Sequence, residues 1–111
     1  MEILIVDDDT ATRECLTELF RRQGHQTAAC GSVEAAQAML PYVDAVICDG
    51  LNGRWLNVVI AAETLGRPAV LYTGDSDLAD DARDAGVSVV LKPGSVEELI
   101  EALRQPVEAA R

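Results

Sequence analysis

The chain has 111 residues, 49% of them apolar and 25% charged, with a formal net charge of −10. This length fits one domain with a single buried core. The acidic excess argues against a broad surface for nucleic acid or anionic membranes, and no apolar run approaches the roughly 18–20 residues of a membrane span. No signal-like segment precedes the first apolar run. We therefore expect a cytoplasmic protein that contacts neither nucleic acid nor membrane.

Short apolar runs alternate with amphipathic stretches along the whole chain. In chain order, the first half predicts a strand over 3–6, a helix over 12–23 that stops at Gly24, a weak strand over 26–30, a helix over 32–40 that ends at Pro41, and a strand over 45–48. The second half predicts a helix over 55–62 that finishes near Gly66, a strand over 69–72, a helix over 75–85 closed by Gly86, a strand over 87–91, and a helix over 95–103 ended by Pro106.

Two features of this pattern predict the fold class. Uninterrupted apolar strands of four or five residues are typical of a parallel sheet that is buried on both faces. Leu16, Leu19 and Phe20 form an apolar stripe on the first helix, and Ser95 with Glu98 forms a capping box for the last. Five strand–helix units with right-handed crossovers give an α/β domain, a doubly wound three-layer sandwich with helices on both faces.

The three cysteines, Cys15, Cys30 and Cys48, are odd in number and form no CxxC pair. Each lies in an apolar stretch. This usage predicts buried, reduced thiols in a cytosolic protein.

Polar residues follow four of the predicted strands at the point where each ends. These are Asp7-Asp8-Asp9, Asp49, Thr73-Gly74 and Lys92-Pro93. In a doubly wound sheet, ligands bind outside the carboxyl ends of the strands. We therefore expect all four sets to converge on one edge of the sheet.

The residue types at this edge favour phosphoryl chemistry. Clustered carboxylates repel one another by several kcal/mol at an effective dielectric near 20, so they need a cation or raised pKa values. Hard oxygen ligands suit Mg²⁺, which accepts phosphate oxygens to complete its coordination shell. Asp49 would then be the nucleophile, with the Lys92 ammonium and the Thr73 hydroxyl holding phosphoryl oxygens. The alternative for the three aspartates is a solvated turn that caps the first helix.

These motifs, in this order and at the strand ends, resemble the receiver domain of bacterial two-component response regulators. The resemblance runs from Ile3-Leu4-Ile5-Val6-Asp7-Asp8-Asp9 with Arg13, through Val46-Ile47-Cys48-Asp49 and Leu71-Tyr72-Thr73-Gly74, to Ala85-Gly86 and Leu91-Lys92-Pro93. It implies a flavodoxin-like five-stranded parallel sheet in the order 2-1-3-4-5. Residues 1–105 would form the receiver domain and 106–111 a C-terminal tail.

The same resemblance assigns roles to single residues. It implies phosphotransfer onto Asp49 from a histidine kinase or a histidine phosphotransfer protein, and signalling through a conformational switch to an unknown downstream protein. Asp8 would be a direct Mg²⁺ ligand, Asp7 one acting through water, and the backbone carbonyl of Leu51 a further ligand. Thr73 would be the switch hydroxyl and Lys92 its partner at the phosphoryl group, with a cis peptide before Pro93. The domain would be no enzyme beyond its own phosphotransfer and slow autodephosphorylation, and a homodimer is compatible with it.

The sequence departs from the family pattern at three places. Val89 stands where receivers usually carry an aromatic residue, three positions before the lysine, which puts the usual coupling to an output surface in question. Gly53 replaces a customary proline and predicts a more mobile loop. The intervals from Asp49 to Thr73 and from Thr73 to Lys92 are short, so we expect shortened third and fourth helices and a non-standard partner surface.

Two other functions stay open. A small phosphatase resembling haloacid-dehalogenase-like hydrolases would use the DxD spacing of Asp7 and Asp9, then Thr73 and Lys92, but its downstream acidic pair would have to be Glu97 and Glu98 inside a helix. The other is a receiver-fold binding module that no longer responds to phosphate.

Four further residues have expected places or roles. We expect Trp55 to pack over the sheet rather than anchor a partner. His25 is expected at the surface, and Arg13 near the acidic cluster, where it would moderate the repulsion. Asp75 is a candidate helix cap or the group that orients a hydrolytic water.

Overall fold

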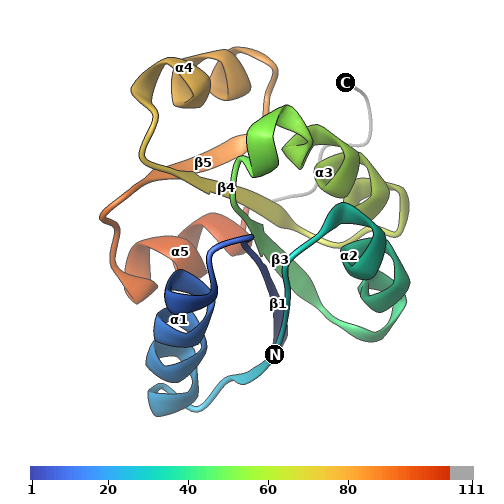
Figure 1. The fold of residues 1–111 in the computed structure, drawn as a ribbon, viewed down its shortest axis with the longest axis vertical. Coiled ribbons are helices and arrows are strands. Elements are labelled where there is room, and N and C mark those ends of the chain that lie inside the picture. Colours follow the sequence, from blue (N-terminus) through green and yellow to red (C-terminus); the bar gives the residue numbers. More distant parts are fainter. Residues whose placement is uncertain (106–111) are drawn as a thin grey trace.

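The computed structural model describes residues 1–105 and forms five strand–helix units (Figure 1). The predicted tail, 106–111, and the predicted helix stop at Pro106 lie outside the described residues. The elements are β1 (Glu2–Val6), α1 (Thr10–Arg22), β2 (Gln26–Cys30), α2 (Val33–Met39), the 3₁₀ turn η1 (Leu40–Tyr42), β3 (Ala45–Cys48), the 3₁₀ turn η2 (Leu51–Gly53), α3 (Trp55–Thr64), β4 (Ala69–Thr73), α4 (Ser76–Asp84), β5 (Ser88–Leu91) and α5 (Val96–Leu103).

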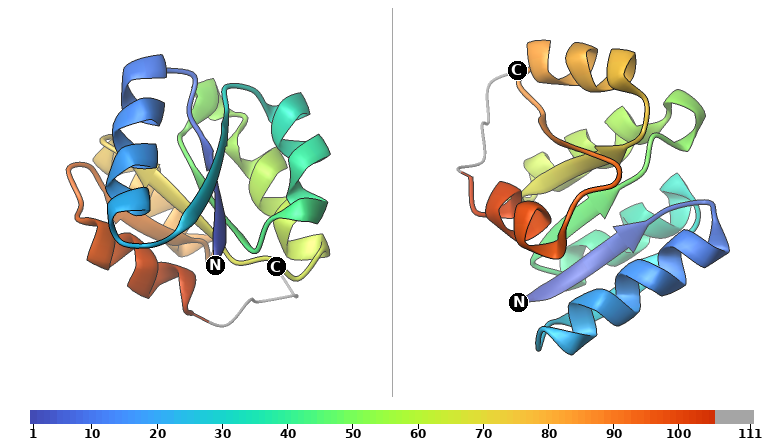
Figure 2. Two further views of the ribbon diagram at one scale, coloured as in Figure 1. Left: turned by 90° about the horizontal axis from the view of Figure 1, so that it is seen from below. Right: turned by 90° about the vertical axis from the view of Figure 1, so that its left-hand side faces the viewer.

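The five strands form one parallel sheet in the order β2-β1-β3-β4-β5. Helices α1 and α5 cover one face, and α2, α3 and α4 cover the other (Figures 1 and 2). The predicted α/β class, strand order and doubly wound arrangement are therefore confirmed.

Burial follows the layers of the sandwich. All four residues of β3 are buried, as are residues 3–6 of β1 and 70–73 of β4, while the edge strand β2 is only partly covered. One core cluster joins the sheet to α2, α3 and α4, and the second joins it to α1 and α5 through Leu16, Phe20 and Leu99. The central strands thus owe their uninterrupted apolar runs to helices on both sides.

Two local expectations were wrong. Cys15 is exposed and Cys30 half-buried, so Cys48 alone is a buried thiol. Leu19 is 40% exposed, which leaves Leu16 and Phe20 as the buried stripe of α1. The predicted end of the second helix before Pro41 is confirmed: α2 ends at Met39, and Pro41 lies in the separate 3₁₀ turn η1, at a position where no amide donor is needed.

Among residues 1–105, no helix combines the length and apolar character that crossing a bilayer requires.

Candidate functional site

Backbone hydrogen bonds continue past the strand ends and hold three of the predicted site residues in line with the sheet. The Asp7 amide donates to Cys30 O (3.1 Å), the Asp49 amide to Val6 O (2.8 Å), and the Lys92 amide to Thr73 O (2.8 Å). These residues therefore keep strand-like order one step beyond the paired register. Their positions are set by the sheet rather than by loops.

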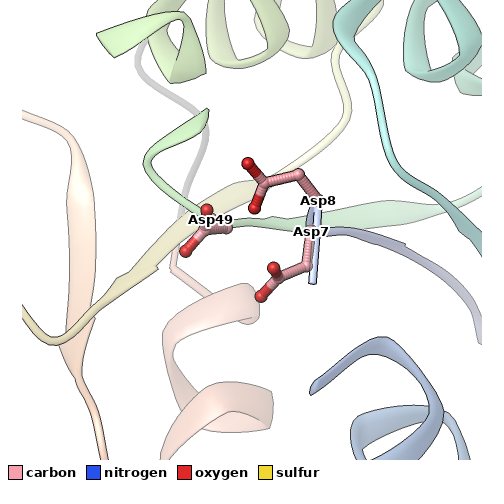
Figure 3. Close-up of side chains that lie close together, drawn as sticks. All are labelled: Asp7, Asp8 and Asp49. Atoms are coloured by element: carbon pink, nitrogen blue, oxygen red, sulfur yellow. The ribbon is translucent and has the colours of Figure 1, made fainter. Parts of the chain in front are cut away.

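The first result of this placement is a group of three carboxylates at the tips of β1 and β3. One oxygen each of Asp7, Asp8 and Asp49 lies within 4.8 Å of the others, and Figure 3 shows the three side chains gathered there. Asp7 is buried, with 3% of its surface exposed, while Asp8 is open to solvent and Asp49 is half-buried. Hard oxygen donors with one open side fit a hydrated divalent cation such as Mg²⁺.

The pKa of Asp7 is raised by its place in the cluster. Burial raises the pKa of its carboxyl, and the neighbouring charge of Asp49 raises it further. The Asp9 amide, which donates to Asp7 Oδ1 at 2.9 Å, and the charge of Lys92 act in the opposite direction but do not cancel the rise in pKa. A bound cation would relieve this repulsion.

Lys92 supplies the positive charge that the protein itself brings to the cluster. Its Nζ lies 3.1 Å from Asp49 Oδ1 and 3.4 Å from Asp7 Oδ2. Burial of the ammonium opposes its charge, but hydrogen bonding and attraction to Asp49 and Asp7 outweigh that effect and raise the pKa of Lys92. It is also the sole lysine of the sequence, since the other eight basic residues are arginines.

Asp9 has a different task from its two neighbours. Its carboxylate accepts hydrogen bonds from the amide and the hydroxyl of Thr12 and caps α1. These bonds lower the pKa of Asp9. The cap interpretation therefore holds for Asp9, while Asp7 and Asp8 join Asp49.

The turn after Asp49 is wound with left-handed backbone. Leu51, Asn52 and Gly53 have φ values of 51°, 52° and 91° in succession, which is unusual for non-glycine residues. The Leu51 amide donates to Asp49 Oδ2 at 3.1 Å. The Leu51 carbonyl, predicted as a metal ligand, accepts from the Arg54 amide at 3.1 Å, and a carbonyl oxygen retains a second lone pair.

Thr73 ends β4 as a buried residue, with 5% of its surface exposed. Its Oγ1 accepts a hydrogen bond from the Asp75 amide at 3.1 Å. Asp75 in turn accepts from the amides of Asp77 and Leu78 and caps α4. This favours the helix-cap interpretation of Asp75 over the orientation of a water.

Known proteins match both the sequence and the fold. Nodulation protein W of Bradyrhizobium diazoefficiens is 29% identical over 118 aligned positions, covering 98% of this chain and 52% of that protein. The DNA-binding response regulator MtrA of Mycolicibacterium smegmatis is 32% identical, covering 92% of this chain and 48% of that protein. A solved response regulator receiver protein from Sinorhizobium medicae superposes with a TM-score of 0.76 at 23% identity, covering 93% of this chain and 90% of that one. Nearly the whole chain is thus similar to response regulators, and its fold is that of solved receiver domains.

No model of a protein family matches the sequence. The chain spans about half the length of the curated relatives it matches.

The phosphatase alternative finds no site among residues 1–105. Asp9 is engaged at the start of α1 and is not part of the carboxylate group. Of the two downstream glutamates, Glu98 completes the capping box of α5 and Glu97 accepts from Gln23. Neither joins Asp7, Asp8 and Asp49 in the acidic group found among residues 1–105.

The structure also locates the residues outside the main motif. Trp55, the first residue of α3, is buried in the core cluster between this helix and the sheet, as expected. His25 is half-buried rather than at the surface, and its ring meets Phe20 edge-on. Arg13 does lie near the cluster, but it acts on the main chain: its Nη1 donates to Asp7 O at 2.7 Å.

Two features of the site could not be predicted from the sequence pattern. The peptide between Lys92 and Pro93 is cis, as the family resemblance implied, but residue types alone do not require it. Tyr72 binds the turn that carries Lys92. No spacing rule signals that contact, because its partner is the backbone of Gly94.

Proposed function

We propose that this receiver domain accepts a phosphoryl group on Asp49 from the phosphohistidine of a histidine kinase or a histidine phosphotransfer protein. Asp7, Asp8, Asp49 and the Leu51 carbonyl would hold Mg²⁺. The observation that carries the proposal is the meeting of three carboxylates with the Lys92 ammonium at one end of the sheet. A nucleophile, a cation site and a positive side chain are the parts that phosphoryl transfer requires.

The proposed reaction is a displacement at phosphorus. A lone pair on an Asp49 carboxylate oxygen forms the new O–P bond, while the bond from phosphorus to the donor's imidazole nitrogen breaks and that nitrogen takes a proton. Lys92, now paired with Asp49, would transfer its ammonium contact to a phosphoryl oxygen, and the Thr73 hydroxyl would turn toward another. When bound, Mg²⁺ would neutralise charge on the phosphoryl group. Slow hydrolysis of the aspartyl phosphate would end the signal.

The partners we propose follow from the same chemistry. A donor must present a phosphohistidine to the exposed side of the cluster, where Asp8 lies. The output would pass through contact with a downstream protein. With a net charge of −10, the receiver domain is not expected to contact nucleic acid itself, and a cytoplasmic location fits a kinase partner.

Labelling from acetyl phosphate tests the acceptor. We expect wild-type protein to take up one phosphoryl group, only when Mg²⁺ is present, as read by intact-protein mass. Asp49→Asn should take up none, whereas Asp84→Asn, which neutralises an exposed aspartate on α4, should label like wild type. Label that persists in Asp49→Asn would defeat the proposal, and steady turnover of an aryl phosphate would favour the hydrolase.

A second candidate is a binding module that ignores phosphate, and Val89 is the observation that favours it. Val89 is half-buried against the core under α2, α3 and α4. Because valine is aliphatic, this position has no aromatic ring whose orientation could report phosphorylation. Beryllium fluoride, a mimic of the phosphoryl group, separates the two functions. A change in amide chemical shifts beyond the carboxylate cluster supports the switch, and shifts confined to the cluster support the binding module.

A further inference from the structure

The Tyr72 hydroxyl makes two hydrogen bonds to a single residue of the β5–α5 turn. The hydroxyl donates to Gly94 O at 3.0 Å and accepts from Gly94 N at 2.9 Å. The side chain comes from β4 and is buried, with 7% of its surface exposed. A buried hydroxyl that satisfies both polar groups of one peptide residue fixes that residue firmly, since either backbone group left unpaired would cost free energy.

Gly94 is fitted to this contact. A Cβ added there would lie 2.5 Å from Val90 Cγ1 and 3.3 Å from Tyr72 Cε1. A side chain at this position would overlap Val90 and crowd the ring, so the turn keeps its place beside the tyrosine only with glycine. The pair therefore behaves as one unit, with the ring on β4 and the bare backbone on the turn.

The turn that Tyr72 binds is the one that delivers Lys92. The Lys92 amide is held by Thr73 O at 2.8 Å on one side, and Gly94, two residues on, is held by Tyr72 on the other. The Lys92 Nζ lies 5.4 Å from the centre of the Tyr72 ring, within the range of a cation–π attraction. From there the ammonium reaches Asp49 Oδ1 at 3.1 Å.

We propose that Tyr72 is a positioning residue for Lys92: its hydroxyl anchors the turn at Gly94, and its ring backs the lysine that faces Asp49. The part of this inference that concerns phosphorylation rests on the proposed function of Asp49. Tyr72 thereby links the strand that carries Thr73 to the turn that carries Lys92. The plainer alternative is a tyrosine whose hydroxyl is merely satisfied and has no influence on the lysine.

The chain offers matched variants for the test. Tyr72→Phe removes the two hydrogen bonds and keeps the ring. Tyr42→Phe makes the same change at the other tyrosine, which is 80% exposed. Gly94→Ala places a Cβ 2.5 Å from Val90 Cγ1, so the turn must shift, and it serves as an independent second variant. The folded state of each is checked by its thermal transition.

The first readout needs neither metal nor phosphodonor. Protein labelled with ¹³C in lysine gives a single ε-methylene signal, because Lys92 is the sole lysine. We expect this signal to move toward the position of a solvent-exposed lysine in Tyr72→Phe and in Gly94→Ala, and to stay unchanged in Tyr42→Phe. A Lys92 signal that is the same in Tyr72→Phe as in wild type overturns the proposal.

The second readout is the rate of phosphoryl uptake from acetyl phosphate at saturating Mg²⁺. If the lost alignment costs about 1 kcal/mol, the typical net value of one hydrogen bond, uptake should be about fivefold slower in Tyr72→Phe when Mg²⁺ saturates both proteins. In a Lys92→Met background the same substitution should add nothing. An equal loss in both backgrounds would mean a general structural effect and would refute the positioning role. If wild type takes up no label, the proposed function fails, while the lysine signal still decides the role of Tyr72.

Discussion

The Lys92 ammonium lies 3.1 Å from Asp49 Oδ1 and bridges it to Asp7, whose Oδ2 is 3.4 Å away. The two pairs join residues that are 43 and 85 positions apart in sequence. Both carboxylates therefore share one positive charge from the protein. The lysine and a metal ion would both offset the same repulsion between Asp7 and Asp49.

Replacing Lys92 by methionine should expose that repulsion. Without metal, we expect Lys92→Met to lower the free energy of unfolding by roughly 1–3 kcal/mol, because Asp7 and Asp49 lose their shared counter-charge. The stabilisation by saturating Mg²⁺ should be larger than in wild type, since the cation becomes the main source of compensation. Urea unfolding in EDTA and in Mg²⁺ measures both quantities.

A surface cation provides the control for this substitution. Arg104 is exposed and lies 3.9 Å from Glu101, so Arg104→Met should change the stability by less than about 1 kcal/mol, with no dependence on Mg²⁺. Equal Mg²⁺ stabilisation in wild type and Lys92→Met would contradict the shared role of lysine and metal.

These residues show which features of the site could be predicted from the sequence. Strand-end placement of Asp7, Asp49 and Lys92 follows from apolar runs and the parallel topology, and this is why the fold and the convergence of the site were predictable. Contacts with backbone atoms were not, because they depend on where the chain turns. The contact of Arg13 with Asp7 O and that of Tyr72 with Gly94 are of this kind.

Exposure on a helix was the other source of error. Cys15 and Leu19 belong to an apolar-looking stretch, yet only Leu16 and Phe20 face the sheet. A thirteen-residue helix presents its flanks to solvent, and residue type does not show which side of the stripe is covered.

Neutralising Asp7 should stabilise the metal-free domain. The fold raises the pKa of Asp7, so its protonated form is favoured in the folded state, and that contribution to stability is present below the ordinary pKa and lost as pH rises through the folded pKa. At neutral pH in EDTA, Asp7→Asn should therefore be more stable than wild type by about 1–2 kcal/mol. The advantage should shrink as pH falls through the folded pKa of Asp7.

Urea unfolding at a series of pH values follows this difference, with Asp84→Asn as a comparison at an exposed aspartate. In excess Mg²⁺ the order should reverse, because the variant lacks one metal-facing carboxylate. An advantage of Asp7→Asn that is constant across pH would rule out repulsion as its origin.

The left-handed turn after Asp49 should make Gly53 sensitive to substitution. Gly53 has φ of 91°, and a Cβ at this position would have no atom within 4 Å. Any loss in Gly53→Ala therefore comes from backbone conformation alone, and we expect about 1–2 kcal/mol in chemical unfolding. Asn52→Gly relaxes the same turn and should be neutral or slightly stabilising. A Gly53→Ala protein as stable as wild type would show that the turn readily adopts another shape.

The reactivity of the three thiols should show whether the sheet stays closed beside Asp49. Burial raises the pKa of Cys48 far above that of a free thiol, the charge of Asp49 adds to the effect, and its Sγ donates to Asp49 O at 3.1 Å. Burial also raises the pKa of the half-buried Cys30, whereas Cys15 is exposed on α1.

Since the thiolate is the reactive form, we expect Ellman's reagent to modify Cys15 rapidly in the folded protein and all three cysteines in urea. Cys15→Ser should remove the fast phase, and peptide mass mapping identifies the modified residue. Rapid modification of Cys48 in the folded state would mean that β3 opens next to Asp49, which is incompatible with a nucleophile held rigidly by the sheet.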